Sequence, residues 1–240
     1  MSPITSGVSR HSIDWHPYKK VAKNSGSDLV ETIESYYDTH VIRIPFGDYT
    51  VDEEINFTVA DNTHPKFIGD GSEGVIIRSS EAKVFHAAPG TFSGGGTTQK
   101  CTISGMEIKH TTDAATDVSL DLLGCQANLN DVQLTMASGG TRQGIGVLCG
   151  SGDDTSPSGS PSQWHAVNTY RYGTGFDVGL DHLSMYDCMV YGCANYGFRI
   201  RDTWPGSEGS NYAHWIALFH PQINGDGQHA TMYPFHFTKP

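Results

Sequence analysis

Short segments in which apolar and polar residues alternate recur along most of the 240-residue chain. Such alternation predicts β-strands with one buried side and one solvent-facing side. Two of these segments share the pattern Gly-aromatic-x-aliphatic, Gly175–Val178 and Gly197–Ile200, and they begin 22 residues apart. A self-similar spacing in the low twenties is typical of proteins built from stacked repeats. The pattern therefore predicts a solenoid of short strands.

A second frame supports this prediction: an apolar residue, any residue, a small or turn-forming residue, then apolar-x-apolar. It occurs at Ile103–Ile108, Leu129–Leu134, Val167–Tyr172 and Met185–Val190, with Gly105, Asp131, Thr169 and Asp187 at its third position. Hairpins cannot join all of these strands, because the Asn-Gly and Asp-Gly dipeptides that favour tight hairpin loops are scarce. We expect about eight turns of a coil between residues 41 and 237, each rising by about 4.8 Å.

The two ends of the chain differ from this repeat. Residues 27–37 predict a helix, capped by Ser27 or Asp28, that covers the N-terminal end of the coil and its exposed sheet edge. Residues 1–26 lack periodicity and are interpreted as an extended arm for docking on another protein, and residues 27–240 as a single β-helix domain. The aromatic segment 232–237 is expected to close the coil or to meet a symmetry mate.

Three motifs follow the predicted helix: Val-Ile-Arg-Ile-Pro-Phe-Gly-Asp-Tyr-Thr-Val at 41–51, Phe-Ile-Gly-Asp-Gly at 67–71 and Val-Ile-Ile-Arg at 75–78. This arrangement resembles the opening of right-handed parallel β-helix proteins, the pectate-lyase-like and polygalacturonase-like superfamily that includes phage tailspikes. The resemblance implies an all-β fold, a right-handed parallel β-helix solenoid with a short N-terminal capping helix. It leaves the activity open, because the superfamily contains lyases, hydrolases and non-catalytic virion proteins.

The charge balance narrows the choice of partners. The chain carries 26 acidic and 15 basic residues, a net charge of −11. This balance disfavours nucleic acid, which is bound by basic surfaces. It also disfavours an acidic polymer such as pectate, unless a local basic strip or bound Ca²⁺ compensates.

Neither a signal peptide nor a membrane-spanning segment is expected from the sequence, and neither is a cofactor or a metal site. The five cysteines are an odd number and too few for a disulfide scaffold, so we expect buried, reduced thiols. A secreted polysaccharide-degrading enzyme normally carries a signal peptide, whereas a virion component released by lysis needs none.

Catalytic residues are sought in the outward positions that line up from strand to strand. Asp121, Gly146, Asp177 and Arg199 are expected to form one such column. Two carboxylates two strands apart, about 10 Å, suit an inverting glycoside hydrolase. A lyase would use Arg199 or Arg171 as base or charge stabiliser, with Ca²⁺ on acidic neighbours. The alternative is a solvated surface on which Asp177 and Arg199 form a cross-strand ion pair. The polygalacturonase motifs (Asn-Thr-Asp, Asp-Asp, Gly-His-Gly and Arg-Ile-Lys) are not present as a set.

Aromatic residues at the edges of three predicted corner loops are the candidates for glycan binding. They are Phe92, Trp164, Trp204 and Tyr212. Aromatic faces beside polar loops are suited to stack on sugar rings. The alternative is that these side chains cover the open sides of the coil or pack against a neighbouring subunit.

These features together predict a virion structural protein, a spike or decoration protein such as a tail spike, tail fibre or capsid turret. We expect a homotrimer that is located in the virion and is extracellular after lysis. Its N-terminal arm would contact other virion proteins and its β-helix a host glycan, without nucleic acid or membrane insertion. The alternatives are a polysaccharide lyase or glycoside hydrolase acting on the outer face of the coil, and a cell-encoded surface adhesin.

Overall fold

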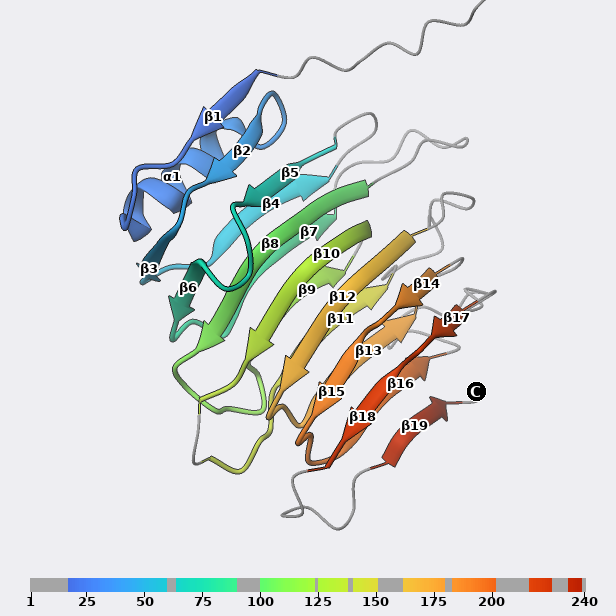
Figure 1. The fold of residues 1–240 in the computed structure, drawn as a ribbon. Helices are drawn as coiled ribbons and strands as arrows, with labels where there is room; N and C mark the ends of the chain where they lie inside the picture. Colours follow the sequence, from blue (N-terminus) through green and yellow to red (C-terminus); the bar gives the residue numbers. More distant parts are fainter. Residues whose placement is uncertain are drawn as a thin grey trace, which may run out of the picture.

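The computed structural model describes residues 17–59, 64–89, 100–123, 125–137, 140–150, 162–179, 183–201, 216–225 and 233–238. This part of the chain consists of β-strands and one helix, α1 (Gly26–Tyr36), and every strand pairing in it is parallel (Figure 1). The prediction of a β-rich fold of stacked parallel strands is therefore confirmed.

The strands form two sheets. The larger, twelve-stranded sheet contains β1 (Tyr18–Lys20), β2 (Val41–Ile44), β3 (Gly47–Val51), β5 (Lys66–Gly69), β6 (Val75–Ser79), β8 (Lys100–His110), β10 (Gln126–Thr135), β12 (Ser162–Tyr170), β14 (Leu183–Tyr186), β15 (Met189–Tyr191), β17 (Ile216–Phe219) and β18 (Gln222–Asn224). The smaller, seven-stranded sheet contains β4 (Ile55–Val59), β7 (Lys83–Pro89), β9 (Val118–Leu123), β11 (Ile145–Gly150), β13 (Thr174–Gly179), β16 (Tyr196–Arg201) and β19 (Tyr233–Thr238).

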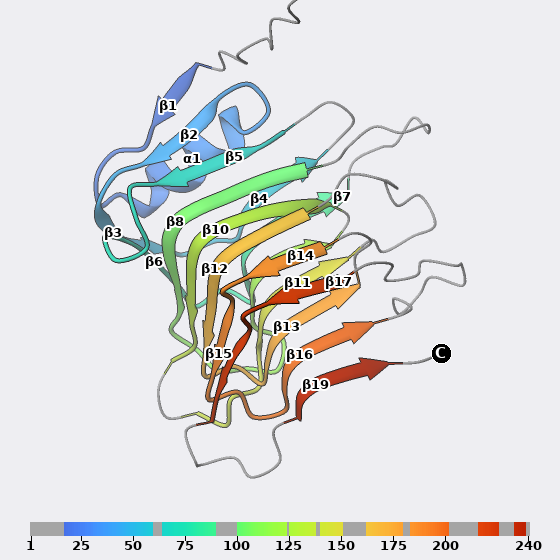
Figure 2. The ribbon, with the colours of Figure 1, turned by 45° about the vertical axis from the view of Figure 1, so that its right-hand side comes forward.

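The chain passes from the larger sheet to the smaller one and back, and each strand pairs with the strand one pass earlier. In the smaller sheet β9, β11 and β13 are neighbours, while β10 and β12, which separate them in sequence, are neighbours in the larger sheet. Figure 2 shows β13, β16 and β19 stacked in this order toward the C-terminal end. The seven strands of the smaller sheet correspond to seven passes, one fewer than expected.

Aromatic side chains stack through the core along this direction. Phe176 and Phe198 occupy paired positions, with ring centroids 4.9 Å apart and planes within 12°. Trp164 lies 5.9 Å from Phe176 on the larger-sheet side, and Phe235 continues the stack 5.4 Å beyond Phe198. Full burial of one such side chain stabilises the fold by about 1.5–3 kcal/mol. The 22-residue spacing in the sequence is thus the length of one pass.

The glycine of the Gly-aromatic pattern is required because both the facing sheet and the neighbouring strand lie close to it. A Cβ atom on Gly175 would lie 2.7 Å from the Thr169 hydroxyl and 2.8 Å from the carbonyl oxygen of Gly197. Both distances are shorter than real Cβ contacts, so only glycine fits without a shift of the backbone.

Residues in the left-handed conformation turn the larger sheet at one corner. They follow aligned strand positions and are Gly105 (φ 65°), Asp131 (φ 53°), Ala166 (φ 50°), Asp187 (φ 51°) and His220 (φ 50°). The prediction that Thr169 occupies this corner position is wrong. Trp164, rather than Val167, aligns with Leu129 and Met185, which places Ala166 at the corner.

The helix α1 packs against β2, β3 and β4 at the N-terminal end of the sheets. It buries Leu29, Val30 and Ile33, as the spacing of apolar residues predicts. Its N-cap is Ser25, whose hydroxyl accepts a hydrogen bond from the Asp28 backbone amide at 3.2 Å, so the helix begins earlier than predicted.

The range predicted as an extended arm, 1–26, is described from residue 17 onward. Here β1 pairs with β2, and Val21 is buried with 2% of its surface exposed. This part therefore belongs to the sheet, because its apolar residue packs into the core. Residues 1–16 lie outside the described residues. At the other end, Tyr233, Phe235 and Phe237 of β19 are exposed.

Candidate functional site

The predicted catalytic column lies on the face of the smaller sheet opposite to the core. Its successive positions are Asn56, His86, Asp121, Leu148, Asp177, Arg199 and His236. Asp121 and Asp177 are two strands apart, as predicted. The placement of Gly146 between them is wrong, because Leu148 pairs with both aspartates.

Asp177 is held by two arginines and has no exposed surface. Arg201 donates from Nε to Oδ1 at 2.6 Å and from Nη2 to Oδ2 at 2.5 Å, and Arg199 donates from Nη2 to Oδ2. The hydrogen bond to Asp177 raises the pKa of the Arg201 guanidinium. The cross-strand ion pair between Asp177 and Arg199 is confirmed, and Arg201 is an additional partner that sequence reasoning missed.

Asp121 is equally enclosed, with 0% of its surface exposed. Its Oδ2 lies 2.7 Å from Lys83 Nζ and 3.1 Å from His86 Nδ1. A catalytic acid or base must come within hydrogen-bonding distance of its substrate. Two carboxylates that are buried and already bound to basic side chains, with a leucine between them, do not offer this access. Catalysis by Asp121, Asp177 and Arg199 thus gains no support from the geometry.

The predicted glycan-binding aromatics are only partly described. Trp164 is fully buried, and its Nε1 donates a hydrogen bond to the Ala127 carbonyl at 3.0 Å. Its predicted role in sugar stacking is wrong, because its indole faces the core instead of solvent. Phe92, Trp204 and Tyr212 lie outside the described residues.

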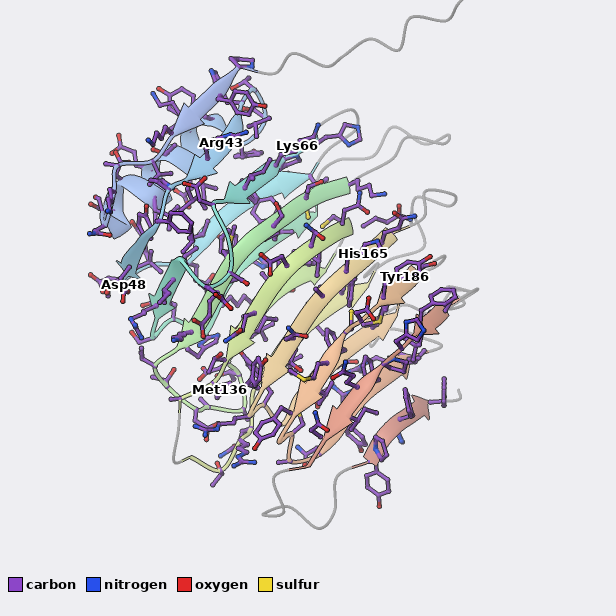
Figure 3. All side chains as sticks on the ribbon, viewed as in Figure 1. Arg43, Asp48, Lys66, Met136, His165 and Tyr186 are labelled. Carbon is purple, nitrogen blue, oxygen red and sulfur yellow. The ribbon has the colours of Figure 1, made fainter. Side chains whose placement is uncertain are left out.

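The outer face of the larger sheet carries an aromatic column that the sequence analysis missed. His165 and Tyr186 stack with centroids 4.5 Å apart, and Tyr186 and Phe219 with centroids 4.6 Å apart, all planes within 6° (Figure 3). His165 is exposed, and Phe219 keeps 43% of its surface exposed. The signal in the sequence is an aromatic residue immediately before the corner residue in three successive passes.

Beyond the corner, the same face carries a polar network around Glu107. Gln133 Nε2 and the Thr135 hydroxyl donate to Glu107 Oε1 at 3.1 and 3.0 Å, and Lys109 Nζ lies 3.0 Å from Oε2. Glu107 is 6% exposed. Three protein donors thus occupy most of the acceptor capacity of this nearly buried carboxylate, so Glu107 organises its neighbours instead of presenting a free carboxylate.

A hollow of about 380 Å³ opens beside this network. It is lined by Arg78, Lys109, His110, Thr111, Thr135 and Arg171, together with Met136, which is labelled in Figure 3. Its volume is within the range of small-molecule sites, about 300–1,000 Å³. Basic residues dominate this lining although the whole chain is acidic.

Among the described side chains, no group of three or more His, Cys, Asp and Glu residues is placed to hold a metal ion. No described helix has the length and apolar character to cross a membrane. The five cysteines are all buried and form no disulfide, and burial raises the pKa of the Cys188 thiol to about 12. These thiols are therefore packing residues in the described structure.

Known proteins offer no further assignment: no family model, curated protein or solved structure matches the chain. The functional proposal consequently rests on the geometry of the described residues.

Proposed function

We propose that the chain folds as a right-handed parallel β-helix of the pectate-lyase-like kind. The support is the alternation between two parallel sheets, with each strand paired one pass before and one pass after itself. Connections between parallel strands of one sheet are right-handed in about 98% of cases, which favours this hand. A rod of this type is a rigid scaffold for an extended binding surface.

On this scaffold the proposed function is attachment to a glycan, as a virion spike or decoration protein. The observation that carries the proposal is the stacked column of His165, Tyr186 and Phe219 on the outer face of the larger sheet. Within the stack the rings cover one another's faces, so a sugar would pack against the outer edges of the column and against its end ring, Phe219, which is 43% exposed. Because the rings are already stacked on one another, little conformational freedom remains to be lost on binding.

A non-catalytic role fits the enclosed carboxylates better than glycoside cleavage does. Asp121 and Asp177 are buried in ion pairs, and Glu107 is occupied by three protein donors. Glycosidases instead present two carboxyl groups on either side of the scissile bond. The protein is therefore expected to bind polysaccharide without shortening it.

The test is a glycan array probed with the purified full chain, followed by titration of the best glycan. We expect Tyr186→Thr to weaken binding by about fivefold or more, the loss of roughly 1 kcal/mol of stacking. Tyr18→Thr is the matched control, because Tyr18 is an exposed tyrosine on β1, 62% accessible, outside the column. Equal affinities of the two variants would refute the aromatic column as the binding surface.

The enzymatic alternative is tested on the same polysaccharides by release of reducing ends and by the ultraviolet absorbance of unsaturated products. If such activity is lost in Asp177→Asn but kept in a variant of equal stability, the enzymatic function would replace the attachment function.

The virion assignment predicts that mass spectrometry detects the protein in purified virus particles. The homotrimer predicts three times the chain mass of 26.0 kDa by light scattering, and the exposed aromatics of β19 are candidates for subunit contact.

A further inference from the structure

Three basic side chains lie on neighbouring strands at the N-terminal end of the larger sheet. They are Lys20 on β1, Arg43 on β2 and Lys66 on β5, and the last two are labelled in Figure 3. Lys20 and Arg43 are exposed, and Lys66 is half-buried. Among the described residues, no carboxylate forms an ion pair with any of the three. Positive charge therefore gathers at this end of a chain whose net charge is −11.

The register of the strands places two of these cations directly opposite each other. Lys20 pairs with Arg43, and the next position in the column is Ile68. Like charges at opposite positions destabilise a sheet. The Arg43 guanidinium lies over the ring of Tyr18, with Cζ 4.6 Å from the ring centroid, and Tyr18 is 62% exposed. The surface thus holds unpaired positive charge close to β1, where an acidic ligand would relieve the repulsion.

The strand β1 is also the edge strand of the larger sheet (Figure 1). The Val41 amide donates to the Pro17 carbonyl and the Val21 amide donates to the Arg43 carbonyl, both at 3.0 Å. Backbone groups alternate in direction along a strand, so those of Tyr18 and Lys20 point away from β2. Within the described part of the chain, β1 pairs with no strand other than β2. Its outer edge is therefore a template for a further strand.

The open edge and the positive charge together indicate the kind of partner. A polypeptide strand carries N–H and C=O groups at the spacing that the edge of β1 presents, whereas a polysaccharide or a nucleic acid does not. Alternate side chains of an added strand would lie about 5 Å from Tyr18 and Lys20 on the same face. Lysine on an edge strand discourages pairing between two copies of that strand and favours a strand of opposite charge.

We propose that the N-terminal edge of the larger sheet binds an extended acidic segment of a partner protein. The segment adds a strand beside β1, with carboxylates at alternate positions next to Lys20 and to the Arg43 guanidinium over Tyr18. This inference goes beyond glycan attachment and does not depend on it, because β2, β5, β8 and β10 separate β1 from β12, where the aromatic column begins. The coil could thus be anchored at one end while its aromatic column remains accessible.

The probe is an acetylated and amidated octapeptide of alternating glutamate and threonine, titrated into the full chain by isothermal titration calorimetry. The same peptide with glutamine in place of glutamate is the neutral counterpart. The double variant Lys20→Gln/Arg43→Gln removes the facing cations without breaking an ion pair among the described residues. Arg171→Gln is the matched control, because Arg171 also lacks an ion pair there and follows the distant strand β12. Thermal unfolding verifies that both variants fold.

We expect the glutamate peptide to bind at least tenfold more tightly than the glutamine peptide. The double variant should weaken its binding about tenfold, the combined effect of two exposed ion pairs, and Arg171→Gln should leave it unchanged. Rising salt should weaken the interaction. In the complex, hydrogen–deuterium exchange should slow at the amides of Tyr18 and Lys20, because strand addition pairs them.

Several results would overturn the inference. Equal affinities of the two peptides would reject the role of charge, and unchanged exchange at Tyr18 and Lys20 or equal effects of the two variants would reject the location. If neither peptide binds but phosphatidylserine vesicles or duplex DNA bind through Lys20 and Arg43, the partner is a membrane or a nucleic acid and not a protein. Tyr186→Thr, which tests glycan attachment, should leave peptide binding unchanged, so the two proposals fail separately.

Discussion

Replacement of Asp177 by asparagine tests whether the buried ion pairs of the smaller sheet stabilise the fold. The substitution keeps the size of the side chain and removes its charge, so Arg199 and Arg201 both lose the carboxylate that they share. The side chain of Asp177 is 0% exposed, and those of Arg199 and Arg201 are 21% and 18% exposed. Both guanidinium groups are thus too enclosed to be fully rescued by water.

The magnitude follows from this enclosure. Removing one partner of a buried pair costs about 3–5 kcal/mol, because it strands an uncompensated charge. Here both arginines lose this carboxylate, but each retains some contact with water. We therefore expect a loss near the lower end, about 3 kcal/mol.

The assay is urea unfolding followed by circular dichroism, with Asp48→Asn as the matched control. Asp48 pairs with Arg78 at 2.8 Å, but these side chains are 50% and 37% exposed, so the control should lose only about 0.2–1 kcal/mol. For an m-value of about 3 kcal/mol/M, Asp177→Asn should lower the unfolding midpoint by about 1 M. Midpoints that coincide for the two variants would refute the argument from burial.

Two further predictions concern the packing of the sheets and a buried histidine. Gly175→Ala should destabilise the protein by about 1–3 kcal/mol, because its Cβ would overlap atoms of Thr169 and Gly197. Gly225→Ala is the control and should change the thermal midpoint little, because the space around Gly225 is open. Equal thermal midpoints of the two variants would contradict the close packing around Gly175. The pKa of His110 is lowered in the folded state, so the unfolded chain takes up the proton first as the pH falls below about 6.5. The stability of the protein should therefore decrease as the pH falls through this region, and it should decrease less in His110→Gln. If the thermal midpoints of the wild-type protein and of His110→Gln depend on pH in the same way, His110 does not cause the loss of stability.

The parallel stacking could be predicted because the strongest signal in the sequence, the 22-residue spacing of the two Gly-Phe units, equals the length of one pass. Phe176 and Phe198 lie in register, and each follows a glycine whose Cβ position is crowded: Gly175 by Thr169 of the facing sheet, and Gly197 by the Pro234 backbone on the neighbouring strand. The position of Asp121 two strands from Asp177 was predictable for the same reason. The repeat is least irregular in this part of the chain.

Errors arose where alternation alone cannot fix the register. The segment around Gly146 alternates over several residues, so a shift by two positions preserves which side chains face the core and changes only their partners. Leu148 consequently stands where Gly146 was expected. At the next corner, Ala166 adopts the left-handed conformation without the Gly or Asp that signals it.

The hollow could not be recognised from the sequence, because its residues are brought together only by the register. Arg78, Lys109 and Arg171 lie on separate passes and share no motif. The burial of Trp164 was missed because the preceding residues, 151–163, are rich in Ser, Gly and Pro, which suggested a loop edge at a position that belongs to β12.

The left-handed corner residues divide five passes of the larger sheet, those containing Gly105, Asp131, Ala166, Asp187 and His220, into two segments whose alternation is set independently. Asp131, for example, contributes to neither side of the alternation, and Leu129 and Val132 on its two sides both point inward. An evolutionary or engineered change in one half can thus be accommodated without a compensating change in the other. Displacing the corner by a single residue would instead invert one half of that strand, turning Val132 and Leu134 toward water while the adjacent passes kept their own orientation.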